Sequence, residues 1–205
     1  MAEPSRSLII ACGALAHELT TTMERSGWRH LAIQCLPASL HNTPERITDA
    51  VRKKIHEARG HYRHIYVAYA DCGTGGRLDA MLEQEGVARI GGNHCYEFFA
   101  GTDVFTTISD AEPGTFYLTD YLVRHFDRLI IRDLGIDAHP ELQSMYFGNY
   151  RRLVYLAQRH DEALLEKARA AARRLNLEFE HRLTGLEPFN RALHDMDPVS
   201  LPWPG

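Results

Sequence analysis

Three cysteines and one histidine stand where the sequence changes from predicted strand to predicted loop. Cys12 and Cys72 are each followed directly by glycine, and His94 directly precedes Cys95. Thiolate sulfur and imidazole nitrogen are donors that zinc, reduced copper and iron–sulfur clusters take in proteins. These residue types predict a metal site, with zinc as the first choice among divalent metals. Because neighbouring side chains in an extended stretch point to opposite sides, the sequence leaves open which of His94 and Cys95 binds.

Three further polar residues lie close to these positions along the chain. His41 follows the second predicted strand, Asp71 directly precedes Cys72, and Glu97 lies two residues after Cys95. Carboxylates and imidazoles beside a metal orient its ligands and transfer protons, so we expect a catalytic role for all three. Two alternatives stay open, since His41 could cap a loop and Asp71 could cap the turn that follows it.

Glycines accompany the predicted ligands. Gly13 follows Cys12, and the run of residues 73–76 after Cys72 holds three glycines and Thr74. Glycine lets the backbone turn sharply or approach a ligand closely, and a glycine-rich loop at a helix start can hold a phosphate. The run matches neither a P-loop nor a dinucleotide fingerprint. We therefore expect Gly13, Gly73 and Thr74 to contact a cofactor, although the pattern does not identify which one.

The elements around these residues must bring them to one place. Apolar runs at residues 8–11, 31–36 and 65–70 are typical of buried strands, and residues 87–90 form a weaker one. Amphipathic helical patterns separate the strands. This alternation predicts an α/β, Rossmann-like fold with a mostly parallel sheet and helices on both faces. Ligands bind at the carboxyl ends of such strands, so the candidate residues are expected along one edge of one sheet.

The rest of the chain continues the same pattern. Residues 153–157 and 177–183 are predicted strands, and an Ala-rich helix covers residues 161–175. Residues 117–131 show helical spacing. A chain of 205 residues suits one domain over 1–205, with a loose Pro-rich tail at 195–205.

Composition narrows the classes of function. The formal net charge of −4 argues against a nucleic-acid-binding protein, and no apolar run is long enough to cross a membrane. The start of the chain lacks the pattern of a secretory signal, so a cytoplasmic location is expected. The four cysteines are then expected to be thiols or metal ligands instead of disulfides. Cys35, inside a predicted strand, is expected only to pack.

Several motifs resemble an uncharacterised domain-of-unknown-function family of bacteria and methanogenic archaea. The matching segments are IACGAL (10–15), LPASLHN (36–42), DCG (71–73), HCYE (94–97), LTD (118–120) and YFGNY (146–150). The resemblance implies genomic company with corrinoid proteins and corrinoid-dependent methyltransferases, which makes a corrinoid protein an expected partner. Such company is an association and does not define a mechanism.

Three functional hypotheses follow from the residues. In the first, a metal held by Cys12, Cys72 and Cys95 or His94 lowers the pKa of a small substrate thiol or alcohol, which takes part in methyl transfer in one-carbon metabolism. In the second, an accessory protein carries a metal, an iron–sulfur cluster or a corrinoid for a partner enzyme. In the third, Cys12 or Cys72 is a metal-free nucleophile activated by a histidine.

Overall fold

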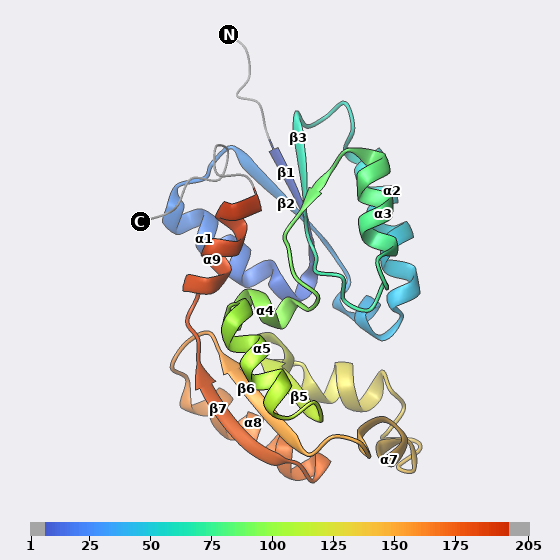
Figure 1. The fold of residues 1–205 in the computed structure, drawn as a ribbon, viewed down its shortest axis with the longest axis vertical. Helices are drawn as coiled ribbons and strands as arrows, with labels where there is room; N and C mark the ends of the chain where they lie inside the picture. The colour runs from blue at the N-terminus through green and yellow to red at the C-terminus, as the bar shows by residue number, and fades with distance from the viewer. Residues whose placement is uncertain (1–6, 197–205) are drawn as a thin grey trace. The chain divides into compact units, whose positions relative to one another are not determined.

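The computed structural model describes residues 7–196, which form two compact units (Figure 1). Unit 1 contains the chain up to Cys95 together with the residues from Phe189 onward, and unit 2 contains Tyr96–Pro188. Each unit has a sheet in which all described strand pairs are parallel, so the predicted α/β class is confirmed. The expectation of one sheet is corrected to two sheets. A single domain over residues 1–205 stays a prediction.

The sheet of unit 1 has the strand order β2-β1-β3-β4. Its strands are β1 (Ser7–Cys12), β2 (Leu31–Leu36), β3 (His64–Ala68) and β4 (Ala88–Arg89). Strand β3 pairs with β1 on one side and β4 on the other, as its continuous apolar run predicts for an interior strand. Every residue of β1 is buried, so Cys12 at its carboxyl end belongs to the core of unit 1.

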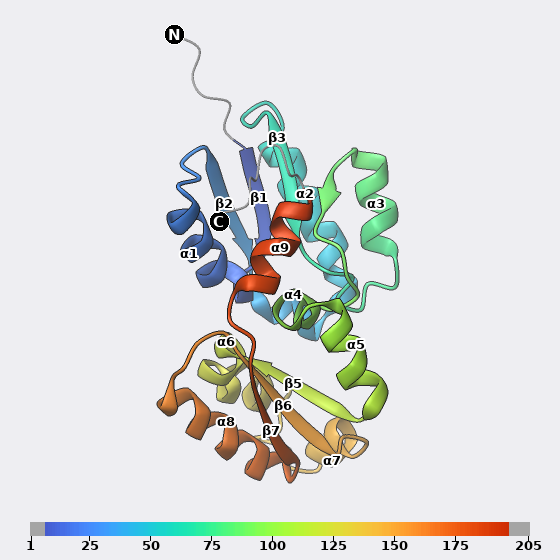
Figure 2. The same cartoon turned by 60° about the vertical axis from the view of Figure 1, so that its left-hand side comes forward.

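Helices cover both faces of this sheet (Figures 1 and 2). On one face lie α1 (Ala16–Ser26) and α9 (Glu187–Met196), and on the other lie α2 (Ile47–Ala58) and α3 (Arg77–Glu85). The buried Thr22 hydroxyl donates a hydrogen bond of 2.6 Å to Asn190 and joins α1 to α9. Of the predicted Pro-rich tail, residues 195 and 196 belong to α9, and the others lie outside the described residues.

Three short turns of 3₁₀ helix in unit 1 lie close to the candidate residues in sequence. They are η1 (Gly13–Leu15), η2 (Ala38–Asn42) and η3 (Pro44–Arg46). Turns η1 and η2 follow the carboxyl ends of β1 and β2, and η3 leads directly into α2. They therefore set the direction in which Cys12 and His41 present their side chains.

Unit 2 has the strand order β5-β6-β7. Its elements are α4 (Cys95–Ala100), whose first residue belongs to unit 1, α5 (Thr102–Ala111), β5 (Thr115–Thr119), α6 (Asp120–Arg124), the π-helical turn η4 (Asp127–Arg132), α7 (Leu142–Phe147), β6 (Arg152–Ala157), α8 (Glu162–Leu175) and β7 (Glu178–Leu183). Phe105 and Ile108 of α5 pack in one buried cluster with Tyr117 of β5 and with Val154 and Leu156 of β6. The expected helix over residues 117–131 is corrected at its start, where residues 117–119 belong to β5, while α6 and η4 make most of the remainder helical.

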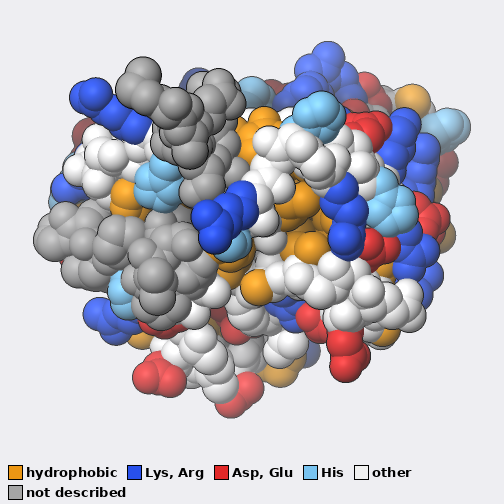
Figure 3. All heavy atoms as spheres, turned by 90° about the horizontal axis from the view of Figure 1, so that it is seen from above, with side chains coloured by type: hydrophobic (Ala, Val, Ile, Leu, Met, Phe, Trp, Pro, Cys, Tyr) orange, Lys and Arg blue, Asp and Glu red, His pale blue; other side chains and the backbone are white. Residues whose placement is uncertain are grey.

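The surface carries charges of both signs. On the face that Figure 3 shows, Lys and Arg side chains are interspersed with Asp and Glu side chains among the described residues. This mixture fits a formal net charge of −4 spread over 205 residues. Within the part of the chain that the structure describes, no helix combines the length and the apolar character needed to cross a bilayer.

Candidate metal centre

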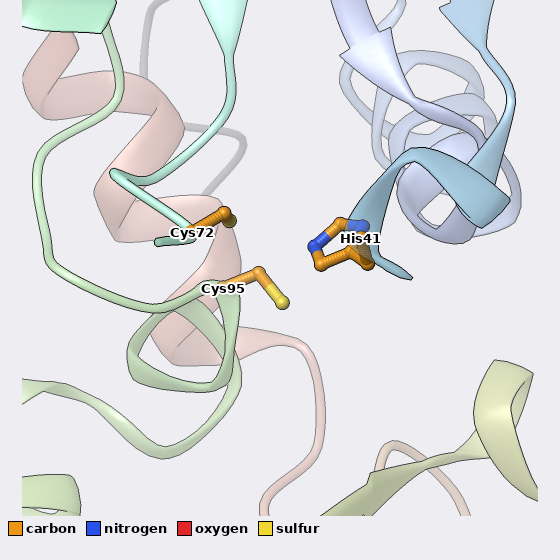
Figure 4. A group of neighbouring side chains, drawn as sticks. All are labelled: His41, Cys72 and Cys95. Atoms are coloured by element: carbon orange, nitrogen blue, oxygen red, sulfur yellow. The ribbon is translucent and has the colours of Figure 1, made fainter. Parts of the chain in front are cut away.

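Unit 1 brings one histidine and two cysteines together. The donor atoms of His41, Cys72 and Cys95 all lie within 4.8 Å of one another. Figure 4 shows the two cysteine side chains on one side and the His41 ring facing them from the other. His41 comes from η2, Cys72 from the loop after β3, and Cys95 from the first position of α4. The group therefore joins three segments that are distant in sequence.

A sharp turn of the backbone presents Cys72. Its φ is 48°, in the left-handed region that residues other than glycine rarely adopt, and Gly73 continues the turn with φ 83°. A Cβ placed on Gly73 would lie 3.4 Å from Cγ of Pro44, in η3. The loop thus packs closely on the segment that follows His41. Strained conformations of this kind concentrate at functional sites, where the surrounding structure holds them in place.

Backbone hydrogen bonds fix the Cys95 loop beside the Cys72 loop. The N–H of Asp71 donates to the carbonyl of Gly92 at 3.2 Å, and the N–H of Cys72 donates to the carbonyl of Asn93 at 3.0 Å. The Arg89 guanidinium also donates to the Gly92 carbonyl, at 3.1 Å. The distance between the two cysteines is therefore set by the backbone and does not depend on their side chains alone.

The carboxylate of Asp71 closes the Cys72 loop from within. Its oxygens accept hydrogen bonds from the Thr74 hydroxyl at 2.6 Å, from the Gly76 N–H at 2.8 Å and from the Gly75 N–H at 3.1 Å. Burial acts to raise the pKa of Asp71, but these hydrogen bonds outweigh it and the pKa is lowered. The structure places Asp71 in the loop-capping arrangement that the sequence left open.

Removal of the Asp71 carboxylate is expected to weaken metal binding indirectly. In Asp71→Ala the loop loses three hydrogen bonds and Cys72 loses its fixed position, so we expect about a tenfold weaker zinc affinity, at the lower end of the range for groups that orient ligands. Competition with a chromophoric chelator measures the affinity. Asp49→Ala, at an exposed position of α2, is the matched control. Equal affinities in the two variants would contradict the role of this loop.

The two cysteines of the group differ in their electrostatics. The pKa of Cys72 is lowered to about 5, mainly by the hydrogen bond from the Cys95 thiol and further by His41, against the opposing effect of burial. The hydrogen bond to Cys72 and burial raise the pKa of Cys95 well above its usual value. Of the two cysteines, Cys72 is therefore the one whose surroundings favour the thiolate, and Cys95 the one whose surroundings favour the thiol.

His41 points an unused nitrogen at these sulfurs. Its Nδ1 lies 3.6 Å from Sγ of Cys12, whereas its Nε2 is buried and has no hydrogen-bond partner among the described atoms. Burial acts to lower the pKa of His41, but its interactions with Cys12 and Cys72 raise it well above the usual value. The ring also stacks on that of Tyr69, with centroids 6.4 Å apart and planes at 18°. Buried polar atoms in proteins nearly always have a hydrogen-bond partner, so a buried ring nitrogen without one indicates a position where a ligand could bind.

The structure separates the predicted ligands. Cys72 and Cys95 lie in the group of donors, whereas Cys12 lies outside it, behind the His41 ring, where its sulfur accepts a hydrogen bond of 3.4 Å from the N–H of Ala14. The side chain of His94 is exposed. His41, predicted as a catalytic residue, stands in the position that the prediction gave to a ligand.

The other predicted site residues have structural surroundings of their own. Glu97 is buried in the part of α4 that belongs to unit 2. Thr74 is buried, and its hydroxyl is bound to Asp71. A Cβ on Gly13 would approach the Leu36 carbonyl to 3.0 Å, so glycine allows β1 to lie close to the end of β2. Contact of Gly13, Gly73 and Thr74 with a cofactor stays a prediction.

Sequence reasoning missed Tyr69 altogether. Its side chain is 1% exposed, and its hydroxyl is buried without a hydrogen-bond partner among the described atoms. Burial first, and then Cys12, raise the pKa of Tyr69, so the phenol stays protonated. The only sequence signal for Tyr69 was its place near the end of an apolar run, where a tyrosine is usually interpreted as a core residue.

Comparison with known proteins places the chain in a family without giving it an activity. A family model described as "Protein of unknown function (DUF1638)" matches residues 35–193. No curated protein and no solved structure matches the chain. The matched segment includes His41, Cys72 and Cys95, whereas Cys12 precedes it. Because the match covers well over half of the sequence, the chain belongs to this family of proteins of unknown function.

Proposed function

We propose that unit 1 binds a divalent metal ion, with zinc as the first choice, through Nε2 of His41 and the sulfurs of Cys72 and Cys95. The observation that carries the proposal is the buried Nε2 of His41, which has no hydrogen-bond partner among the described atoms, on a ring that faces Cys72 and Cys95 (Figure 4). The donor atoms of the three residues lie within 4.8 Å of one another. Two sulfurs and one nitrogen are a donor set that zinc takes in proteins. Binding a cation would release protons, since a metal takes cysteine as thiolate and histidine as neutral imidazole.

A set of three protein ligands suits chemistry better than a purely structural role. Structural zinc sites are closed by four protein ligands, whereas catalytic sites have three and keep the fourth position for water or substrate. The bound ion would supply a Lewis acid that lowers the pKa of a substrate thiol or alcohol. The chain contributes a rigid frame, because backbone hydrogen bonds already fix the loops of Cys72 and Cys95.

Methyl transfer with a corrinoid partner is the more specific form of this proposal. The substrate thiol would give up its proton to solvent, and its sulfur would accept the methyl group of a methylated corrinoid held by the partner. In this step a sulfur–carbon bond would form as the methyl–corrinoid bond breaks, and the corrinoid of the partner would keep the electron pair. Support comes from the donor set of three residues, which would leave a fourth position for substrate, and from the family resemblance seen in the sequence. The metal site does not depend on this choice of reaction.

Elemental analysis tests the metal proposal directly. Protein purified anaerobically without added metal is expected to be colourless and to contain about one zinc per chain, which a strong chelator removes and added zinc restores. A brown protein with iron and sulfide would replace zinc by an iron–sulfur cluster, as in the accessory-protein hypothesis. A protein without metal that takes up none, and whose Cys72 reacts with iodoacetamide equally fast with and without chelator, would contradict the proposal and favour thiol chemistry.

A further inference from the structure

We infer that Cys12 is a positioning residue, whose sulfur accepts a hydrogen bond from Nδ1 of His41 and so directs Nε2 toward Cys72 and Cys95. The inference rests on the proposed metal site and deepens it, because it assigns to Cys12 a role different from the ligand role that the sequence predicts. The distance from Sγ to Nδ1 is 3.6 Å. Metal-binding histidines usually donate their second ring N–H to a nearby acceptor, most often a carboxylate, a backbone carbonyl or water, which holds the ring in place. Here the sulfur of Cys12 takes that position.

The backbone holds Cys12 and His41 at a fixed separation. Cys12 is the last residue of β1, is 2% exposed, and pairs in register with Leu36 at the end of β2. The next residue, Gly13, lies so close to β2 that a Cβ there would be 3.0 Å from the Leu36 carbonyl and 3.6 Å from the N of Ala38. Ala38 begins η2, which carries His41. The first residue of η2 therefore packs against the backbone at Gly13, next to Cys12.

The chemistry of imidazole determines which atom is the donor in the contact between His41 Nδ1 and Cys12 Sγ. A neutral ring has one N–H, so when Nε2 binds a cation the proton must be on Nδ1, which then needs an acceptor. Sγ of Cys12 is the acceptor within reach, and it already accepts from the Ala14 N–H at 3.4 Å. A sulfur that receives donors from two sides is well suited to remain an acceptor. Cys12 therefore favours the tautomer that metal binding requires.

Tyr69 completes the surroundings of the Cys12 sulfur and the ring. Its ring lies nearly parallel to that of His41, at an interplanar angle of 18°, and limits rotation of the imidazole. Its hydroxyl is buried and has no hydrogen-bond partner among the described atoms. Burial raises the pKa of Tyr69 most, and Cys12 raises it further. No other acceptor for Nδ1 is present in the described contacts of His41.

Three variants test the inference by zinc affinity in competition with a chromophoric chelator. Cys12→Ala is expected to bind zinc about 10–100-fold more weakly while still reaching one zinc per chain, because it removes an orienting group and no ligand. Cys12→Ser should recover part of the loss, since a hydroxyl also accepts from Nδ1. Cys35→Ser, at an exposed position of the neighbouring strand, is the control and should match the unmodified protein.

Cobalt spectroscopy separates an orienting residue from a ligand. The thiolate-to-cobalt charge-transfer band grows with the number of sulfur ligands, so at saturation it should be the same in Cys12→Ala as in the unmodified protein. Loss of about a third of the band would make Cys12 a third thiolate ligand and overturn the inference while leaving a metal site. Zinc affinities equal in Cys12→Ala and the unmodified protein would also overturn it, again with the metal site intact.

One measurement needs no variant and so does not depend on a variant's folding. In the zinc-loaded protein, nitrogen-15 spectra of the His41 ring should show a protonated Nδ1 and a metal-bound Nε2. The reverse assignment, with metal on Nδ1, would overturn the positioning role. An unmodified protein that binds neither zinc nor cobalt would overturn the proposed function itself, and the inference with it.

Discussion

Cys72→Ser and Cys95→Ser are each expected to weaken zinc binding by more than about 100-fold, the largest effect on the site that we anticipate. Each change removes one of three donors that lie within 4.8 Å of one another. Removing a direct ligand lowers metal affinity by more than the 10–100-fold that is typical when an orienting group is removed. His41→Ala should have a loss of the same order, because the buried Nε2 is the only nitrogen in the group. Zinc content after gel filtration and a chelator competition give the occupancy and the affinity.

The matched control is Cys35→Ser, which changes the same atom at an exposed site on β2 and should keep full occupancy. A circular-dichroism melt of each variant separates loss of metal from loss of fold. Full zinc occupancy in a folded Cys72→Ser protein would eliminate the proposed centre. The structure also orders the cysteines by expected effect, with Cys72 and Cys95 above Cys12, whereas all three have the same predicted role in the sequence analysis.

The approximate place of the site could be predicted from sequence because it depends on topology. Strand β3 is apolar and interior, and parallel strands bring their carboxyl ends to one edge. Cys72 follows such an end, and Cys95 and His41 follow two others by a few residues. The strand-end argument needs only which residues come after which strands, and this is what the order of apolar runs provides.

The roles within the site could not be predicted, since they depend on the directions of side chains. The turn η2 aims the His41 ring at Cys72, and the left-handed backbone at Cys72 sets the direction of its sulfur. Neither follows from residue type, because an ordinary residue with positive φ gives no compositional signal as glycine does. This local geometry places His41 in the group of donors and Cys12 outside it, whereas the sequence predicts the reverse.

The two sheets escaped prediction for a different reason. Alternating strands and helices predict parallel pairing within a sheet, but they do not say where one sheet stops and the next begins. Near that change the spacing of Leu118, Tyr121 and Leu122 looks helical, although Leu118 belongs to β5. Strand β5 passes into α6 without a loop, so one apolar pattern runs across two kinds of element. Long-range pairing with β6 decides the assignment.

Asp120→Ala is expected to produce the largest loss of stability in unit 2, about 3 kcal/mol in the free energy of unfolding. The Asp120 side chain is buried at the first position of α6, directly after β5, where Oδ1 accepts the Tyr155 hydroxyl at 2.7 Å and the Gln158 N–H at 3.1 Å. Guanidinium nitrogens of Arg124 and Arg159 each lie 3.8 Å from Oδ2. Alanine would leave two buried donors unpaired, which costs more than the net value of the hydrogen bonds themselves.

Urea denaturation measures the loss, with Asp110→Ala on the exposed face of α5 as the control that should change the midpoint little. Because Asp120 acts through shared partners, its effect should not add to that of Tyr155→Phe. The double variant is expected to be more stable than the sum of the two losses predicts, by roughly 1 kcal/mol or more, since phenylalanine removes one donor that alanine leaves unpaired. Strict additivity, or a loss in Asp120→Ala no larger than in the control, would show that this buried carboxylate does not join β5 to β6 as its hydrogen bonds indicate.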